Sequence, residues 1–175
     1  GCPKCSRQTS KIELRIYTEI LSIFPDAKLR SKVGRDEVDI LIPSLRVGIE
    51  FSARVWHKQR QTKDRSKHER LSQQGLSVVH ILEDGLERIG KYDVFFTSYH
   101  DELTLVALAI EGLKHALAYR GCSTSPLDMW PGEFTNEKEY NRLASALPGA
   151  LPEQSVEASE YSLEWDDERN APISK

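Results

Sequence analysis

The stretch EVDILIPSLRVGIEF, residues 37–51, indicates the fold of this chain more clearly than any other segment. Polar and apolar residues alternate on both sides of Pro43–Arg46, and this alternation predicts two β-strands joined by a tight turn. Asp39 lies on the first strand and Glu50 on the second. Because strand side chains change face at every residue, one hairpin can direct both carboxylates to a common point.

Hydrophobic periodicity predicts further elements around this hairpin. Helices are expected over 11–24, 62–74, 100–119 and 136–146, and strands over 27–33, 37–42, 47–52 and 76–82. Ser10 and Glu13 fit a capping box at the start of the first helix, and Gly75 is placed to end the second. The apolar strand 76–82 is typical of a buried strand that is parallel to its neighbour. The expected order is α-β-β-β-α-β, an α/β fold with a mixed central sheet.

The length of 175 residues corresponds to about one domain. We expect a core over residues 10–98, a helical C-terminal extension over 99–150 and an acidic, mobile tail over 151–175. The longest apolar run is far below the about 18 residues of a membrane span, so no membrane partner is expected. Three cysteines do not suggest a disulfide framework, which favours a reducing, intracellular, cytoplasmic setting.

Charge is distributed unevenly along the chain. Residues 153–175 carry seven acidic side chains against two basic ones, whereas residues 28–70 carry twelve Lys and Arg against six Asp and Glu. The segment with the two carboxylates is therefore basic, which favours a nucleic-acid partner, although a solvated surface with no partner has the same composition. The predicted phosphate contacts are Arg30, Lys32, Arg54, Lys58, Arg60 and Lys63, with Lys67 as a further candidate. Trp56 is interpreted as a core residue, with a DNA-binding role, stacking on or wedging between bases, as its alternative.

An ordered set of short motifs gives this chain a family resemblance. The set comprises Asp39-Ile40-Leu41-Ile42-Pro43, Ile49-Glu50-Phe51, Trp56-His57, Asp64-x-x-Lys67, Leu71 and Gly75. It resembles the PD-(D/E)xK, or restriction-endonuclease-like, nuclease superfamily, particularly the branch of very-short-patch-repair endonucleases and zinc-ribbon-associated nucleases. The resemblance covers about residues 10–83. It implies a restriction-endonuclease-like core and a bacterial or phage-like setting.

This resemblance also implies a magnesium-dependent active site. Asp39, Glu50 and the main-chain carbonyl of Phe51 would bind Mg²⁺ or Mn²⁺, and such hard cations prefer oxygen ligands. Glu13 is similar to the helix glutamate that many members add to the metal shell, although its capping-box role competes with that use. His57 stands where the patch-repair branch has a catalytic histidine, and imidazole suits proton transfer near neutral pH.

One departure from the superfamily pattern concerns the motif lysine. Two residues after Glu50 this chain has Ser52 where the superfamily usually has Lys. We predict that Lys67 supplies the missing cation, with Lys63 and Lys58 as alternatives. A plain surface ion pair between Asp64 and Lys67 would explain that spacing equally well.

Cys2 and Cys5 form a C-x-x-C that is similar to a zinc knuckle, and residues 1–9 are interpreted as a remnant of one. Zinc requires four ligands, so Cys122 with a histidine, or residues before Gly1, would have to complete the site. An inert thiol pair is the alternative.

The sequence therefore predicts a magnesium-dependent DNA endonuclease. A second hypothesis is a catalytically inactive nuclease-fold module that binds DNA or docks in a larger complex, because the motif lysine is absent. The acidic tail would then address a protein partner. Metal-dependent cleavage of DNA separates the two hypotheses.

Overall fold

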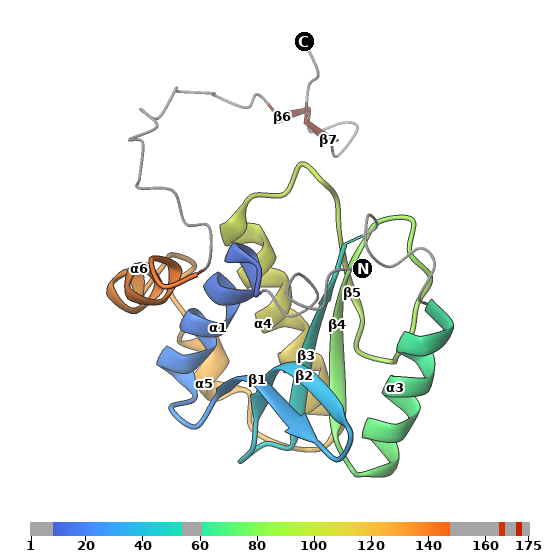
Figure 1. Cartoon of the computed structure of the whole chain (residues 1–175). Helices are drawn as coiled ribbons and strands as arrows, with labels where there is room; N and C mark the ends of the chain where they lie inside the picture. The colour runs from blue at the N-terminus through green and yellow to red at the C-terminus, as the bar shows by residue number, and fades with distance from the viewer. Residues whose placement is uncertain (1–8, 54–60, 148–164, 167–170, 173–175) are drawn as a thin grey trace.

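Five strands form one mixed sheet in the order β1-β2-β3-β4-β5 (Figure 1). They are β1 (Lys28–Val33), β2 (Asp36–Ile42), β3 (Val47–Ser52), β4 (Ser77–Glu83) and β5 (Val94–Phe96). This computed structural model describes residues 9–53, 61–147, 165–166 and 171–172. Strands β1 to β3 are antiparallel, and β3 to β5 are parallel. The predicted α/β class with a mixed sheet is confirmed.

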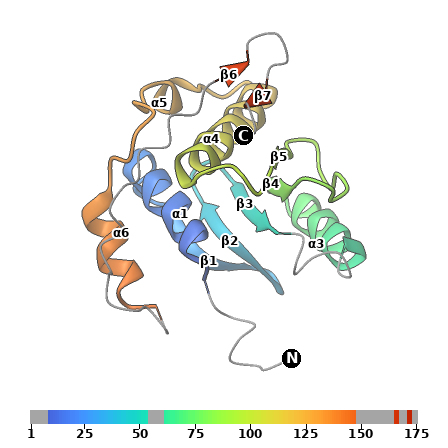
Figure 2. The same cartoon turned by 90° about the horizontal axis from the view of Figure 1, so that it is seen from above.

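The helices lie on both faces of the sheet. They are α1 (Lys11–Ile23), α3 (Gln61–Gln73), α4 (Glu102–Tyr119), α5 (Ser125–Asp128) and α6 (Glu137–Ala144). Seen from above, α1 and α4 cover one face and α3 covers the other (Figure 2). The predicted order α1-β1-β2-β3-α3-β4 is confirmed, and α3 lies between the parallel strands β3 and β4. Within the described ranges, no helix is long and apolar enough to cross a membrane.

Local sequence signals set two of the helix ends as predicted. At the start of α1 the Ser10 hydroxyl accepts a hydrogen bond from the Glu13 amide (3.2 Å), and the Glu13 carboxylate accepts one from the Ser10 amide (3.1 Å). The predicted capping box is thus confirmed. Gly75 follows α3 with φ of 76°, a left-handed conformation that glycine adopts without a Cβ clash.

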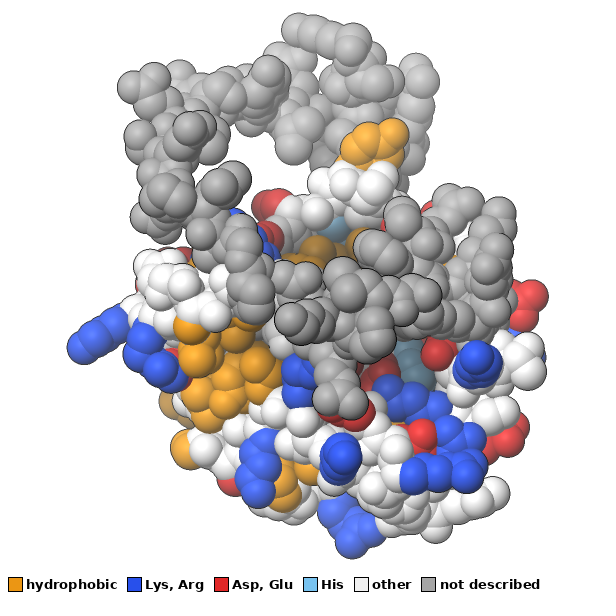
Figure 3. All heavy atoms as spheres, viewed as in Figure 1, with side chains coloured by type: hydrophobic (Ala, Val, Ile, Leu, Met, Phe, Trp, Pro, Cys, Tyr) orange, Lys and Arg blue, Asp and Glu red, His pale blue; other side chains and the backbone are white. Residues whose placement is uncertain are grey.

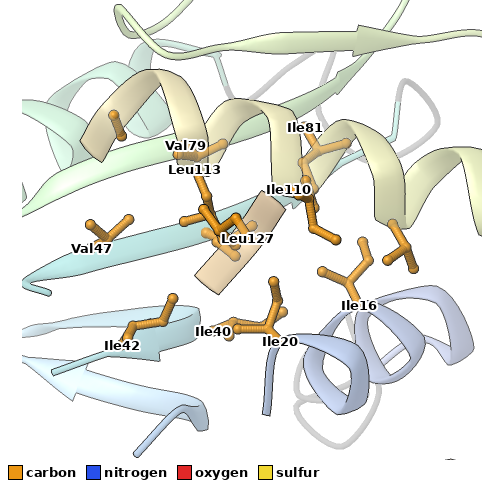
Figure 4. Close-up of a cluster of buried hydrophobic side chains, with 14 of the residues drawn as sticks. Ile16, Ile20, Ile40, Ile42, Val47, Val79, Ile81, Ile110, Leu113 and Leu127 are labelled. Atoms are coloured by element: carbon orange, nitrogen blue, oxygen red, sulfur yellow. The ribbon is translucent and has the colours of Figure 1, made fainter. Parts of the chain in front are cut away.

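The main core lies between the sheet and the pair α1 and α4. Figure 4 shows Ile16 and Ile20 of α1 and Leu113 of α4 directed toward Ile40 and Val79 of the sheet. These side chains are fully buried, and each large aliphatic side chain removed from water contributes roughly 1.5–3 kcal/mol. This face therefore supplies most of the stabilising apolar contact and holds β2 and β3 in place.

The opposite face has a small apolar cluster beneath α3. It consists of Val38, Leu71, Leu76 and Val78. Apart from this cluster, α3 is attached through polar side chains, including a two-pronged hydrogen bond from the Arg70 guanidinium to Asp36 (2.6 and 2.8 Å). The position of α3 therefore depends on charged contacts more than that of α1 or α4 does.

Four short elements were absent from the sequence predictions. The three-residue strand β5 and the four-residue helix α5 are too short to show a period. Within the predicted acidic tail, β6 (Trp165–Asp166) and β7 (Ala171–Pro172) pair as antiparallel strands. The assignment of residues 151–175 to a mobile tail stays a prediction.

Candidate functional site

The two predicted carboxylates lie next to each other where β2 and β3 leave their regular pairing. The last pair in the β2–β3 register is Ile40 with Ile49, and Asp39 and Glu50 are the next residue on each strand. The Asp39 carboxylate accepts a hydrogen bond from the Phe51 amide (3.0 Å). The hairpin thus brings the Asp39 side chain beside Glu50–Phe51, as the strand pattern predicts.

The β1–β2 hairpin changes face at Asp39, between a part that packs in the main core and a part that packs in the cluster beneath α3. Ile40 packs in the main core, whereas Val38, two residues earlier, packs in the cluster beneath α3. Regular alternation would put both side chains on one face. The switch occurs at Asp39, and its carboxylate is therefore influenced by charges from both sides of the sheet.

Lys67 of α3 reaches Glu50 from the side of the sheet that α3 covers. Its Nζ lies 2.6 Å from Glu50 Oε2, which is the distance of a strong charge-assisted hydrogen bond. Only 9% of Glu50 is exposed, and its second oxygen, Oε1, is buried with no hydrogen-bond partner among the described residues. A buried carboxylate oxygen without a partner is costly and suits a bound cation.

The electrostatics of this pair agree with a site built for a cation. Burial raises the pKa of Glu50 to about 8, the Asp39 charge adds to that rise, and the Lys67 ammonium opposes it. Burial likewise raises the pKa of Asp39, while the Phe51 amide and Lys67 counteract the rise. The buried Glu50 and the half-buried Asp39 thus share one ammonium group, and a divalent cation would favour their ionised forms.

Without divalent metal, thermal stability is expected to fall as pH rises from about 4.5 to about 8. The folded protein keeps a proton on Glu50 that the unfolded chain releases near 4.5, so this stabilisation is complete below that pH and is lost as pH rises through about 8. Glu13, with a pKa of about 7, acts in the same direction. Melting curves in EDTA near pH 5 and pH 9 measure this dependence of stability on pH. Glu50→Gln should reduce the dependence, and an unchanged dependence in that variant would contradict the assignment of the raised pKa to Glu50.

Glu13 combines its capping role with a position close to the carboxylates. Its pKa is raised to about 7 chiefly by burial and next by the charge of Asp39, while Arg30 opposes the rise. The cap is formed, and the same side chain lies within electrostatic range of the site. A role for Glu13 in the metal shell stays a prediction.

The remaining predicted residues divide by location. Lys32 and Lys63 are exposed, and Arg30 donates a hydrogen bond to Glu37. Ser52 is buried. Arg54, Trp56, His57, Lys58, Arg60, Cys2 and Cys5 lie outside the described residues. Figure 3 shows Lys and Arg side chains spread over the face that carries β1, β2 and α3.

Sequence reasoning missed a histidine pair beside the site. His68 Nδ1 of α3 lies 2.9 Å from His80 Nε2 of β4, and His80 is the register partner of Glu50 across the parallel strands. Asp93 raises the pKa of His68, although burial lowers it more. Because His80 lies within the apolar strand predicted over 76–82, the pattern indicated only a buried core strand. The polar His80 in the middle of this apolar segment is the signal that could have identified the pair.

The donor set fits a hard divalent cation. Asp39 and Glu50 offer carboxylate oxygens, and Glu50 Oε1 is a buried acceptor with no hydrogen-bond partner among the described residues. A contribution from the Phe51 main-chain carbonyl stays a prediction. In the described parts of the chain, no group of three or more His, Cys, Asp and Glu side chains has the arrangement of a metal site. The candidate centre therefore depends on two carboxylate side chains and backbone oxygen.

The chain matches none of the known protein-family models, and no curated protein or solved structure is significantly similar to it. The mixed α/β architecture consequently stands on the strand order and pairing described above. Any conclusion about function depends on the residues around Asp39, Glu50 and Lys67.

Proposed function

We propose that this chain is a divalent-metal-dependent endodeoxyribonuclease with a restriction-endonuclease-like core. The observation that carries the proposal is the contact of Lys67 Nζ with Glu50 at 2.6 Å, next to Asp39 at the open end of the β2–β3 hairpin. Two carboxylates and an ammonium group are the side chains that metal-assisted phosphodiester hydrolysis uses. The element order α1-β1-β2-β3-α3-β4 supports the family resemblance of the sequence.

Asp39, Glu50 and the Phe51 carbonyl would hold Mg²⁺ or Mn²⁺. When bound, the metal lowers the pKa of a coordinated water and offsets negative charge on the phosphate. The protein fixes this site through the hydrogen bond from the Phe51 amide to Asp39. Glu13 is the further candidate for the shell.

Lys67 takes the place of the motif lysine in this proposal. It approaches from α3 instead of from the strand position occupied by Ser52, and its ammonium group keeps Glu50 oriented and favours its ionised form. Preorganised cations of this kind stabilise charge that develops in the transition state. We assign proton transfer to His57, which stays a prediction because that residue lies outside the described part of the chain.

The proposal is tested by incubating supercoiled plasmid with the protein and Mg²⁺ or Mn²⁺, with EDTA as the control. Nicked or linear product that requires metal and is lost in Glu50→Gln supports the nuclease. The buried Ser52, at the position of the motif lysine, favours the second hypothesis of a module that only binds DNA or a protein partner. DNA binding without metal-dependent cleavage of duplex, single-stranded, mismatched or branched DNA would establish that alternative.

Binding to duplex DNA is expected to weaken steeply with salt, because Lys and Arg side chains are spread over the face that carries β1, β2 and α3. Lys32→Ala and Lys63→Ala should each lower the slope of log affinity against log salt by roughly 0.9, the value for one phosphate contact. Lys138→Ala, an exposed lysine on α6, is the matched control and should leave the slope unchanged. Fluorescence anisotropy over a range of salt concentrations measures these slopes. Equal slopes in all four proteins would count against this face as the DNA contact.

A further inference from the structure

Arg30 has a backbone conformation that is unusual for its place in the sheet. Its φ is 49°, in the left-handed region, although it lies inside β1 between the paired residues Leu29 and Ser31. A non-glycine residue pays a steric cost in this region because of its Cβ. Such outliers persist where the surrounding structure enforces them, and they are concentrated at functional sites.

The other left-handed non-glycine residue in the described ranges has a local explanation. Arg46, with φ of 51°, closes the tight turn between β2 and β3, and its amide donates to the Pro43 carbonyl (3.0 Å). Its guanidinium donates to the Gln74 and Gly75 carbonyls, which ties the turn to the end of α3. Turns commonly require such a residue, whereas the middle of a strand does not.

The conformation of Arg30 coincides with the change of face in the hairpin. Leu29 packs against the main core and Val33 against the cluster beneath α3, although residues four apart on a regular strand share a face. Ile40 and Val38 of β2, the register partners of Leu29 and Ser31, change face at the same point. Arg30 and Asp39 are therefore opposite each other at the switch.

The Arg30 side chain lies close to the carboxylates of the candidate site. Its guanidinium donates to Glu37 Oε1, and its charge lowers the pKa of both Asp39 and Glu13 against the effect of burial. The side chain is still 25% exposed. Lys67, the other cation in the site, is bound to Glu50. Arg30 is paired in the same way with Glu37, but a guanidinium carries five N–H donors, so it can keep that contact and still donate to a phosphate oxygen.

We propose that Arg30 is a substrate-binding residue that holds a DNA backbone phosphate at the rim of the Asp39–Glu50 site, and that its left-handed backbone directs it there. This inference rests on the proposed nuclease function. The competing explanation is that the left-handed residue serves only to switch the hairpin between its two apolar clusters.

Arg30→Gly separates the two explanations, because glycine adopts the same φ without strain and so retains the switch while the guanidinium is removed. We expect an unchanged or higher melting temperature, a salt slope for duplex DNA lower by roughly 0.9, and a cleavage rate lower by about 10²-fold. Arg30→Lys should recover part of the affinity, because it restores the charge but not the paired donors.

Arg46→Gly is the matched control, since it removes an arginine with the same backbone conformation at the far end of the hairpin. It should leave the salt slope and the cleavage rate unchanged.

If Arg30→Gly and Arg46→Gly bind DNA with the salt slope of the unmodified protein, the inference is overturned even if the protein cleaves DNA. If the unmodified protein binds DNA without cleaving it, the proposed nuclease function fails, and the salt slope still decides the role of Arg30. A protein with no measurable DNA affinity overturns both.

Discussion

Asp39→Asn and Glu50→Gln are each expected to reduce metal-dependent DNA cleavage by about 10³-fold or more. A bound cation contributes several kcal/mol to phosphodiester hydrolysis, and each 1.36 kcal/mol is about a tenfold change in rate. Both substitutions preserve side-chain shape and remove a negative charge. Glu50→Gln also keeps an oxygen that can accept a hydrogen bond from Lys67, so the contact between α3 and β3 is retained.

The same two variants should fold and bind DNA at least as tightly as the unmodified protein. Removing the Asp39 charge relieves the repulsion that raises the pKa of Glu50, and the loss of either carboxylate removes repulsion toward phosphate. Asp26→Asn is the control, because Asp26 likewise accepts a backbone hydrogen bond, from Ser44 (2.7 Å), but lies at the far end of the hairpin. Melting curves, anisotropy and plasmid nicking would be compared for the three variants. Cleavage at the normal rate by Glu50→Gln would end the proposal.

The features that were predictable from sequence are strands with a regular polar–apolar alternation and helix ends with a capping motif. Alternation of polar and apolar residues located β2 and β3, and the spacing of Ser10 and Glu13 located the start of α1. Each depends on a local rule that tertiary contacts did not override. The pairing of Asp39 with Glu50 followed from the hairpin alone.

The features that were not predictable depend on contacts between distant segments. Sequence left three lysines as candidates for the missing cation, and only the path of α3 across the sheet brings Lys67 onto Glu50. A strand was predicted over residues 27–33, but the left-handed Arg30 within it and the accompanying change of face were not. No residue type in that strand signals a positive φ. The contact between His68 and His80 likewise requires that α3 lie over β4.

Lys67→Ala is expected to lower the cleavage rate by about 10²–10³-fold, which is typical of the loss of one preorganised donor. The effect of this substitution on DNA binding should be limited to the loss of about one phosphate contact, seen as a lower salt slope. Lys63→Ala is the matched control, because Lys63 lies one turn earlier on α3 and is exposed. It should weaken binding at low salt while the rate at saturating DNA stays the same. Single-turnover cleavage with excess protein separates these two effects.

Ser52→Lys in the Lys67→Ala background tests whether the cation itself is what matters. Ser52 and Glu50 are two residues apart on β3, so a lysine there would start from the same face of the strand and restore the superfamily arrangement. Partial recovery of the cleavage rate is expected, since Ser52 is buried and the longer side chain must displace its neighbours.

A cleavage rate that falls equally in Lys63→Ala and Lys67→Ala would show that Lys67 acts only as part of the basic surface. The nuclease would then have to obtain its second positive charge from another residue, and Arg30 is a candidate because its charge also lowers the pKa of Asp39.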